Sequence, residues 1–415
     1  MKIINRVLIA NILLFGFLFI VKAQDDFYTV SGIIRDSQSR RPLEYVTILV
    51  ANHNVGTVSN ADGEFSLKIP NSINSGNVVF SHLGYRSSSI AVRGADILGA
   101  EVMLVQVVSM LSDVVIQGGD ARHIVQAAVD RIPLNYSRSP NQLTGFYRET
   151  VQKRRNYINI SEAVVDLYKT SYTQDISSDR LQILKGRKLL SQRASDTLAV
   201  KLLGGPNLSI FVDIVKNPEV LLDDEMLSFF SFRLDNVTQI NGREQYIVSF
   251  QPQVVMPYPL YVGKFYIDKE SFAFTRAEFS VDMSDHRKVT EMILRRRPIG
   301  LQFRPEEVSY VVSYQERDGV NYLSYIRNEL RFRCDWRRRL FSTNYSIVSE
   351  MVVTDINDQN VSAIAWRDAF RPTHILTDRV LDFYDENFWG AYNIIEPTES
   401  LEQAVSRLQR QQQRN

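Results

Sequence analysis

Histidine is the residue type that most often binds metals and moves protons, and the chain has five histidines. A zinc carboxypeptidase site uses His-x-x-Glu, in which both side chains bind one ion. No histidine of this chain has Glu at that position, and the His-Glu-x-x-His motif is absent as well. The residues that stand third after the five histidines are Gly56, Tyr85, Gln126, Val289 and Thr377.

Three other patterns could supply ligands for a cation. Asp223-Asp224-Glu225 and the run Asp355–Asn360 are rich in the oxygen ligands that calcium prefers. The second run lacks the glycine and the terminal glutamate of an EF-hand loop, so a hydrogen-bonded turn is preferred. His374 and Asp378 have the spacing of two ligands on a helix, but a pair of surface residues is the preferred explanation. No metal site is predicted.

Cys334 is the one cysteine of the chain, so no internal disulfide can form. It falls in a predicted strand, Arg331–Trp336, and no histidine is near it in the sequence to act as a base. The nucleophile elbow Gly-x-Ser-x-Gly, the dinucleotide motif Gly-x-Gly-x-x-Gly and the phosphate-binding loop do not occur. We therefore predict no catalytic residue and no cofactor, and expect that the protein is not an enzyme.

Arginine is unusually dense in one region. Six arginines fall between Arg327 and Arg339, and Arg295–Arg297 precede them. In one interpretation they alternate along a strand as a solvated face paired with Asp and Glu. In the other they bind phosphate groups, because planar guanidinium groups match phosphate oxygens. The candidate anionic-ligand patch consists of Arg333, Arg337, Arg338 and Arg339.

The first residues have the pattern of a secretory signal peptide. Basic residues precede an apolar run, Val7–Val21, and Ala23 offers a small residue for cleavage. As a helix this run would be about 22 Å long, which is shorter than the ~30 Å hydrocarbon core of a membrane. Residues 1–23 are therefore predicted to be removed on export. The mature chain is expected in the periplasm or at the outer membrane, with peripheral membrane contact at most.

The mature chain is close to electrical neutrality. Residues 1–23 contain three basic and no acidic residues, so their removal changes the formal net charge from +1 to −2. A protein whose main partner is nucleic acid would carry a basic surplus, so nucleic acid is not expected. The length of 415 residues is enough for two or three globular domains.

Residues 27–105 have the pattern of a β-sandwich. Short β-branched and aromatic runs, such as Val30–Ile34 and Tyr45–Ala51, are separated by turn residues. Asn60–Gly63 forms one such turn, and Phe65–Ile69 then alternates apolar and polar residues. We predict a seven-strand antiparallel sandwich.

Four blocks of this region resemble the carboxypeptidase regulatory-like domain, which is a transthyretin-like β-sandwich. The resemblance implies a non-catalytic accessory module of exported bacterial envelope proteins, and it implies no peptidase activity. The blocks are Val30–Asp36, Pro42–Ile48, Gly56–Phe65 and Phe80–Arg86.

Residues 106–119 are predicted to be a linker strand. Within them, Leu111–Gly118 resembles the strand that follows this domain in TonB-dependent outer-membrane receptors. Such a receptor needs a plug and a 22-stranded barrel, for which the remaining residues are too few. Contact of this strand with an energy-coupling partner is kept as an alternative.

Residues 120–362 are predicted to form a curved antiparallel sheet, half-barrel-like and covered by helices. Asn241-Gly242 and Asp318-Gly319 are hairpin turns between β-rich runs, and Asp268–Ser271 joins a third pair of runs. Three consecutive hairpins indicate a meander and not a parallel sheet. The predicted fold is therefore mainly β, with an α+β second domain.

Helical periodicity appears at three places in this second region. Apolar residues recur at helical spacing from Asp120 to Ile132 and again within Asp285–Arg296. Residues 363–415 are predicted to be a helical segment that packs on the sheet, with Leu401, Val405 and Leu408 on one side of its last helix.

Two resemblances concern the second region. Gly263–Asp268 followed by Phe272–Phe274 is similar to a hairpin of lipoprotein-carrier half-barrels, in which a helix-covered curved sheet can bind acyl chains. A longer resemblance is to exported envelope proteins that join the regulatory-like domain to a domain of unknown function. It rests on Leu143–Glu149, Ser161–Lys169 and Phe388–Asn393.

The leading functional prediction is a non-catalytic envelope protein, in which a docking sandwich is joined to a curved sheet that binds a lipid, a glycan or a partner protein. A periplasmic carrier of lipids or lipoproteins is the first alternative, and an open apolar groove would favour it. A hydrolase with a scattered active site is the second, and a clustered Ser, Cys or His in a cleft would favour that one.

Overall fold

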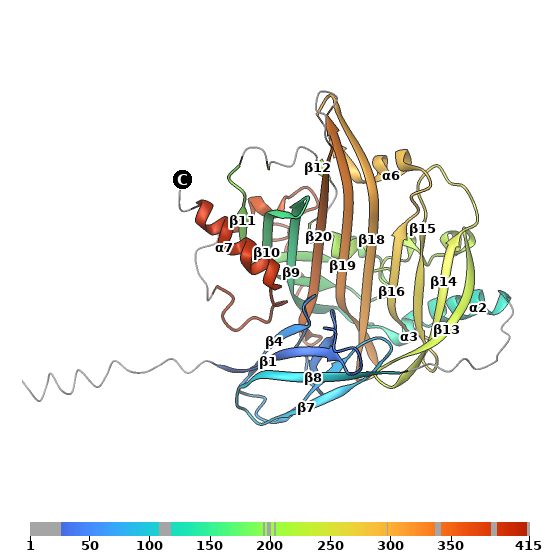
Figure 1. Ribbon diagram of the computed structural model, residues 1–415. Helices are drawn as coiled ribbons and strands as arrows, with labels where there is room; N and C mark the ends of the chain where they lie inside the picture. The colour runs from blue at the N-terminus through green and yellow to red at the C-terminus, as the bar shows by residue number, and fades with distance from the viewer. Residues whose placement is uncertain are drawn as a thin grey trace, which may run out of the picture.

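The computed structural model describes residues 26–107, 118–193, 196, 201–202, 205–296, 298–336, 342–382 and 388–412. Figure 1 shows a small β-sandwich, coloured blue, lying across one end of a large curved sheet. The fold is mainly β with helices added in the second unit, as predicted. The predicted signal peptide lies outside the described residues, and so do residues 108–117 of the predicted linker strand.

The sandwich consists of two four-stranded sheets. Its first and last strands, β1 (Phe27–Asp36) and β8 (Ile97–Gln106), pair in parallel. Gly32 permits this pairing, because a Cβ at that position would lie 1.9 Å from the carbonyl oxygen of Ala100. The other strands are β2 (Thr47–Val50), β3 (Gly56–Val58), β4 (Glu64–Pro70), β5 (Gly76–Ser81), β6 (Tyr85–Arg86) and β7 (Ser88–Val92).

The sandwich confirms the predicted architecture and corrects two details. Its described residues hold eight strands and not seven, and the β1–β8 pair is parallel where antiparallel pairing was expected. The sequence of β8 does not alternate, because its first half is largely exposed and contains Gly99 at φ 70°. The core between the two sheets includes Val30, Ile48, Phe65 and Phe80.

The large sheet has eleven strands in the order β13-β14-β15-β16-β18-β19-β20-β9-β10-β11-β21. Ten of them are antiparallel, and β21 pairs in parallel with β11 at one edge. The strands are β9 (Asn141–Lys153), β10 (Asn156–Lys169), β11 (Arg180–Leu190), β13 (Phe230–Ile240), β14 (Arg243–Pro252), β15 (Tyr261–Asp268), β16 (Phe274–Val281), β18 (Leu301–Arg317), β19 (Val320–Trp336), β20 (Thr343–Asn357) and β21 (Leu381–Asp382).

The three predicted hairpins are present. Asn241 and Gly242 join β13 to β14 at φ 53° and 76°, and Asp318 and Gly319 join β18 to β19 at 51° and 81°. These left-handed values are those that a two-residue hairpin turn requires. The sequence did not reveal that β20 pairs with β9. This pairing attaches β9, β10 and β11 to the end of the meander.

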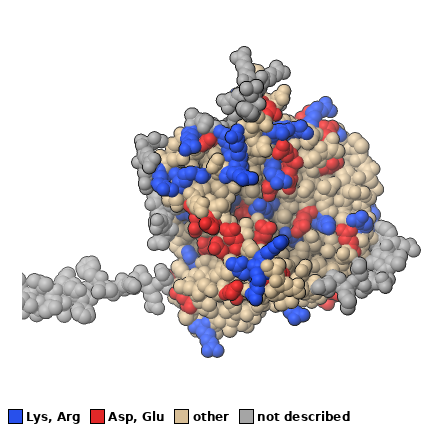
Figure 2. Space-filling model, in the orientation of Figure 1, with Lys and Arg blue, Asp and Glu red and all other residues tan. Residues whose placement is uncertain are grey.

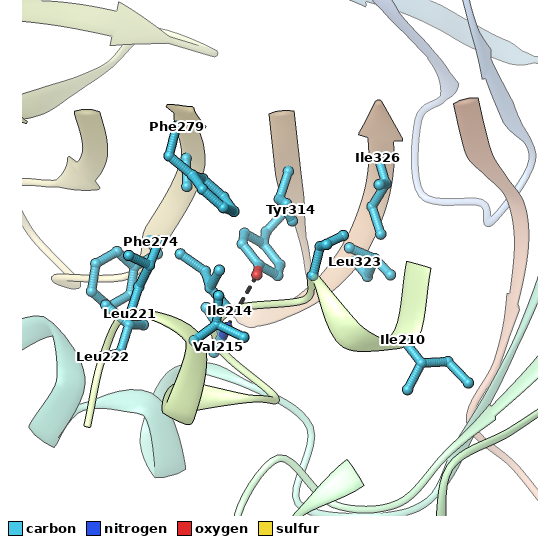
Figure 3. Packing of buried hydrophobic residues seen from close by; sticks show 14 of the residues in the cluster. Ile210, Ile214, Val215, Leu221, Leu222, Phe274, Phe279, Tyr314, Leu323 and Ile326 are labelled. Atoms are coloured by element: carbon cyan, nitrogen blue, oxygen red, sulfur yellow. Dashed lines mark hydrogen bonds between the residues drawn. The ribbon is translucent and has the colours of Figure 1, made fainter. Parts of the chain in front are cut away.

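Helices cover one face of the large sheet, which we call the inner face. The residues between α4 and α5 pack with them against Phe274, Tyr314 and Ile326 of the strands, as Figure 3 shows for Ile214, Val215 and Leu221. The elements are α2 (Gly118–Asp130), α3 (Ile132–Asn135), α4 (Leu208–Phe211), α5 (Asp224–Ser228) and α6 (His286–Ile293), the 3₁₀ turns η2 (Ile176–Ser178), η4 (Pro218–Val220) and η5 (Leu376–Asp378), and the ribbon of β12 (Lys201–Leu202) with β17 (Leu294–Arg296).

The opposite, outer face is covered by the sandwich and by residues 388–412. The ring of Tyr45 in the sandwich stacks on Tyr325 of β19, with 5.6 Å between centroids. Trp389 packs on the outer face beside them, and α7 (Glu399–Gln412) covers β10 and β11 through Leu401 and Leu408. No helix in the described part of the chain is long and apolar enough to cross a membrane.

Candidate ligand-binding site

The side chains of the described residues do not fill the inner face completely. A cavity of about 570 Å³ lies between the strands, α6, the residues around α4 and residues 366–372. We call it the inner cavity. It lies beside the core formed by α2, α4 and α5, toward the α6 end of the sheet. Its apolar walls include Ile176, Leu208, Ile210, Met292, Ile293, Val308, Leu330 and Ile347.

Three polar side chains from neighbouring strands lie together on the floor of the inner cavity. Glu149 of β9 pairs in register with Ser349 of β20, and Ser349 pairs with Asn328 of β19. The Asn328 amide nitrogen donates to the Ser349 hydroxyl at 3.1 Å. The Oδ1 atom of Asn328 has no hydrogen-bond partner among the described residues, although the side chain is only 7% exposed. An unpaired buried acceptor is costly, so a ligand or water that donates a hydrogen bond would be favoured here.

Glu149 is the acidic group of this floor. The Tyr147 hydroxyl donates to its carboxyl oxygen at 3.1 Å. Burial raises the pKa of Glu149 above its usual value, although the hydrogen bonds from Tyr147 and from the backbone of Gly205 act in the opposite direction. A carboxyl group with a raised pKa has a larger neutral fraction at a given pH, and the neutral form can donate a hydrogen bond as well as accept one.

Aromatic rings form the wall toward β15 and β16. Tyr310 stacks on Phe279 at 5.1 Å and contacts Tyr261 edge to face at 6.3 Å between centroids. Burial raises the pKa of Tyr261 to about 12 and raises that of Tyr310 further. Both phenols are therefore neutral at physiological pH, and this wall is apolar with hydroxyl groups.

The mouth of the inner cavity is cationic. Trp366 is 58% exposed there, and the guanidinium groups of Arg180 and Arg371 lie 4.9 Å and 5.4 Å from its ring centroid. Arg295 of β17 is exposed on the side of α6. The arrangement places an apolar interior behind a positively charged opening.

Four charged side chains form a fully buried group, which we call the buried ionic cluster, and one of them, Asp179, also borders the inner cavity. The Lys169 ammonium lies 2.8 Å from Asp213 and 3.5 Å from Asp179, and Lys216 lies 3.8 Å from Asp179. Tyr314 donates to Asp213 at 2.7 Å, and Lys216 donates to the Thr170 hydroxyl at 2.7 Å. These contacts tie the residues between α4 and α5 to the end of β10.

The two lysines of the buried ionic cluster have opposite pKa shifts. Burial would lower the pKa of Lys169, but the charges of Asp213 and Asp179 outweigh it and raise the pKa. For Lys216 burial dominates and lowers the pKa to about 8, against the charge of Asp179 and together with that of Lys169. Because all four groups have partners in the chain, we interpret the cluster as structural.

The predicted anionic-ligand patch is only partly described. Arg333 lies on the outer face of β19, 3.9 Å from Asp335 and 4.0 Å from Glu306. Its neighbours pair similarly, Arg327 with Glu350 at 2.7 Å and Arg331 with Glu307. Figure 2 shows basic and acidic side chains interleaved over the upper part of one face. Arg337, Arg338 and Arg339 lie outside the described residues, so the patch stays a prediction.

The other sequence candidates have local explanations. Asp223 caps α5 by accepting from the Met226 amide at 2.6 Å, and Asn357 accepts from the Gln359 amide in a turn. His374 precedes η5 and contacts Arg379, so it does not share a helix face with Asp378. Burial raises the pKa of Cys334 to about 11, which keeps it a thiol. Within the described residues no group of three or more His, Cys, Asp or Glu side chains could hold a metal ion.

Sequence reasoning missed the residues of the inner cavity. They come from six strands of the large sheet, from β17, α4, α6 and η2, and from irregular segments, and no short motif connects them. One local signal existed on β19, where Asn328 interrupts the apolar inward positions Ile326, Leu330 and Phe332. Lys169 and Lys216 gave no signal, because lysine is almost always a surface residue.

Comparison with known proteins identifies the sandwich. Residues 30–116 match the family model of the CarboxypepD_reg-like domain, which confirms the predicted resemblance for this part of the chain. No curated protein matches the chain by sequence.

Solved structures overlap the large sheet only loosely. A domain named for outer membrane lipoprotein sorting, from Vibrio parahaemolyticus, has 11% identity and a TM-score of 0.31, and the match covers 61% of this chain and 97% of that one. A DUF1329 family protein from Desulfovibrio piger has 10% identity and a TM-score of 0.24, covering 60% and 96%. MucB in complex with MucA(peri) has 11% identity and a TM-score of 0.19, covering 58% and 100%. At these scores the similarities assign no function.

Proposed function

We propose that this chain is a non-catalytic envelope protein whose large sheet binds a ligand with a long apolar part in the inner cavity. The observation that carries the proposal is the cavity itself. Its volume of about 570 Å³ lies in the range of small-molecule sites, and most of its walls are aliphatic or aromatic. Transfer of an apolar chain from water into such a space is favourable in proportion to the area that is buried.

The polar floor supports recognition in addition to simple burial. Asn328 Oδ1 lacks a donor among the described residues, and the raised pKa of Glu149 favours a form that can donate. A ligand hydroxyl or amide, or an ordered water, would satisfy both groups. We propose binding rather than catalysis because the hydrogen bonds of Glu149 come from the Tyr147 hydroxyl and the Gly205 backbone, while the neighbouring Ser349 hydroxyl accepts from Asn328.

The proposed location in the envelope rests on the sequence. Residues 1–23 have the pattern of a signal peptide, and residues 30–116 match an accessory domain. The sandwich is held on the outer face of the sheet by Thr57, which donates to the Ile394 carbonyl at 2.8 Å, and by Asn60, which donates to the Pro397 carbonyl at 3.1 Å. In this arrangement the sandwich supports the sheet on the side away from the cavity.

Binding of a partner protein is the second candidate. The residues between β14 and β15 expose apolar side chains, of which Val255 is 91% exposed and Tyr258 is nearby in the same loop. Apolar groups that gather on a surface often mark an interface.

A matched pair of variants on β20 tests the proposed cavity. Ile347 lines the cavity and Val348, the next residue, points to the other face of the strand. Binding of 1-dodecanol to the mature chain would be measured by displacement of a fluorescent apolar dye. Ile347→Trp should weaken binding by about 10-fold or more because the indole fills the cavity, and Val348→Trp should leave it unchanged.

Circular dichroism and thermal melting of both variants would establish that they fold. Ile347→Phe provides a smaller change if the tryptophan is not tolerated. Failure of the native chain to bind dodecanol saturably, or equal binding by the two tryptophan variants, would overturn the proposal.

A further inference from the structure

A second hollow lies at the free edge of the large sheet, and we call it the edge pocket. Its volume is about 520 Å³. It is lined by the middle of β11, by residues 367–371, by His374 and Arg379, and by Leu381 and Phe388. It therefore lies beside the strand that borders the inner cavity, at the place where β21 joins the sheet.

The edge pocket is strongly cationic. Lys185, Arg371 and Arg379 line it, and no carboxylate of the described residues lies within 4.0 Å of their charged nitrogens. A fourth basic residue, Arg367, lies 3.5 Å from the exposed Asp368. By contrast, the described arginines of β19 stand beside carboxylates, as Arg327 stands beside Glu350 and Arg331 beside Glu307. The edge pocket thus holds positive charge that the described chain does not neutralise.

Aromatic and imidazole rings hold these cations in place. The Lys185 ammonium lies 4.3 Å from the centroid of Phe388, and an Arg379 guanidinium nitrogen lies 2.8 Å from His374 Nε2. Burial lowers the pKa of His374, and the charges of Arg379 and Arg371 lower it further, which reflects the positive field of the pocket. Rings orient a cation without neutralising it, so its N–H groups stay available for an anion.

The edge pocket and the inner cavity share one wall. Ala369, Phe370 and Arg371 line both spaces. The wall is fixed because the Phe370 amide donates to the Leu181 carbonyl at 2.6 Å, and the Phe370 carbonyl accepts from Asn207 at 2.8 Å. A ligand whose tail fills the inner cavity would emerge at Trp366 and Arg371, next to the edge pocket.

We propose that the edge pocket binds the phosphate-bearing head group of an amphiphile whose apolar tail occupies the inner cavity. The inference rests on the proposed function and adds the ligand class, a lipid with an anionic phosphate head. Two guanidinium groups and an ammonium suit phosphate, because forked N–H donors match its oxygens and a second charge on phosphate doubles the attraction. Free phosphate shares this chemistry, so the experiment distinguishes the two sources.

The test compares 1-dodecanol with dodecyl phosphate, both below the concentration at which they form micelles. The native chain should bind dodecyl phosphate at least about 10-fold more tightly at low salt, and this preference should fall as salt is added. The double variant Lys185→Gln/Arg379→Gln should lose the preference and keep its affinity for dodecanol.

The matched control removes two charges at a distance from both hollows. Lys264 and Lys269 lie on and beside β15 and pair with Asp235 and Glu244. Lys264→Gln/Lys269→Gln should therefore keep the full preference for dodecyl phosphate. Equal binding of both amphiphiles by the native chain would overturn the inference, and so would loss of the preference in this control alone. In either case, binding of dodecanol by the native chain would leave the proposed function intact.

The last experiment uses inorganic phosphate as a competitor of dodecyl phosphate. It should compete only weakly with dodecyl phosphate, and Ile347→Trp should weaken dodecyl phosphate binding by blocking the tail. Binding of inorganic phosphate as tight as that of dodecyl phosphate, with no effect of Ile347→Trp on either, would identify a site for free phosphate and overturn the head-group assignment.

Discussion

The buried ionic cluster and the edge pocket contain the same kinds of charge in opposite surroundings. In the cluster, Lys169 and Lys216 are fully buried and each lies within 4 Å of a carboxylate. In the edge pocket, Arg379 is exposed, Lys185 is half-buried and both contact rings, with no carboxylate that close among the described residues. The cluster lies inside the fold, and the pocket lies at the edge of the same sheet.

The difference separates charges that hold the fold from charges that are available to a ligand. A buried ion loses its hydration, so it is tolerated only when partners within the chain replace the water. An exposed cation keeps most of its hydration and needs no partner, so the fold does not depend on it. Stability should therefore depend on the cluster, and binding of anions should depend on the pocket.

Removing a charge from the buried ionic cluster should have the largest effect. Lys169→Met leaves the buried carboxylates of Asp213 and Asp179 without their nearest ammonium group. We expect the free energy of unfolding to fall by about 3–5 kcal/mol, measured by chemical denaturation followed by circular dichroism. A loss below about 1 kcal/mol would show that the cluster does not support the fold.

The double variant Lys169→Met/Asp213→Asn is the control for this change. The amide keeps one acceptor oxygen, which can still accept from the Tyr314 hydroxyl that contacts Asp213 at 2.7 Å, and it removes the excess negative charge. It should recover roughly 1–2 kcal/mol of the loss, because part of the penalty comes from the unpaired carboxylate.

The pH dependence of Lys216 gives the next largest effect. Its pKa is about 8 in the folded chain, whereas the ordinary value is 10.5. Between these values the unfolded chain binds the proton and the folded chain does not, so stability should rise with pH. Relative to Lys216→Met, the native chain should gain up to about 3 kcal/mol from pH 8 to pH 10.5. A difference that does not change with pH would mean that Lys216 keeps its proton.

Charge removal from the edge pocket should have the smallest effect on stability. Lys185→Gln/Arg379→Gln is expected to change the free energy of unfolding by no more than about 0.5 kcal/mol. The change should be stabilising, because the variant removes repulsion between like charges. The same denaturation experiment measures it. A loss comparable to that of Lys169→Met would remove the distinction between the two regions and make the pocket part of the structural framework.

The strands could be predicted from the sequence wherever neighbours in the chain determine them. Asn241-Gly242 and Asp318-Gly319 fix two hairpins through their backbone conformations, and the four blocks of the sandwich carry its turns and core. Strand β8 could not be predicted, because apolar and polar residues do not alternate in its exposed first half. The position of β9 next to β20 in the sheet could not be predicted, because backbone hydrogen bonds between the two strands do not depend on the residue types of either strand.

The candidate sites could not be predicted, because they arise from segments far apart in the sequence. Lys185 and Arg379 approach each other only when residues 367–381 lie along β11. The dense arginines that did attract attention, such as Arg327 and Arg331, are paired with glutamates across neighbouring strands. The dense arginines thus mark a face on which basic and acidic side chains are balanced. The basic residues of the edge pocket, which are not balanced by carboxylates of the described residues, are widely spaced in the sequence.

The pairing of β9 with β20 has a consequence for biosynthesis. Lys153 of β9 pairs with Tyr345, so one hydrogen-bonding edge of β9 stays open until residues 343–357 have been made. During that interval β9, β10 and β11 would have an exposed edge, and their outer face would be uncovered until residues 388–412 follow; both features promote aggregation. The growing chain would therefore benefit from a chaperone that holds these three strands, and its final strands, not its first, would complete the fold.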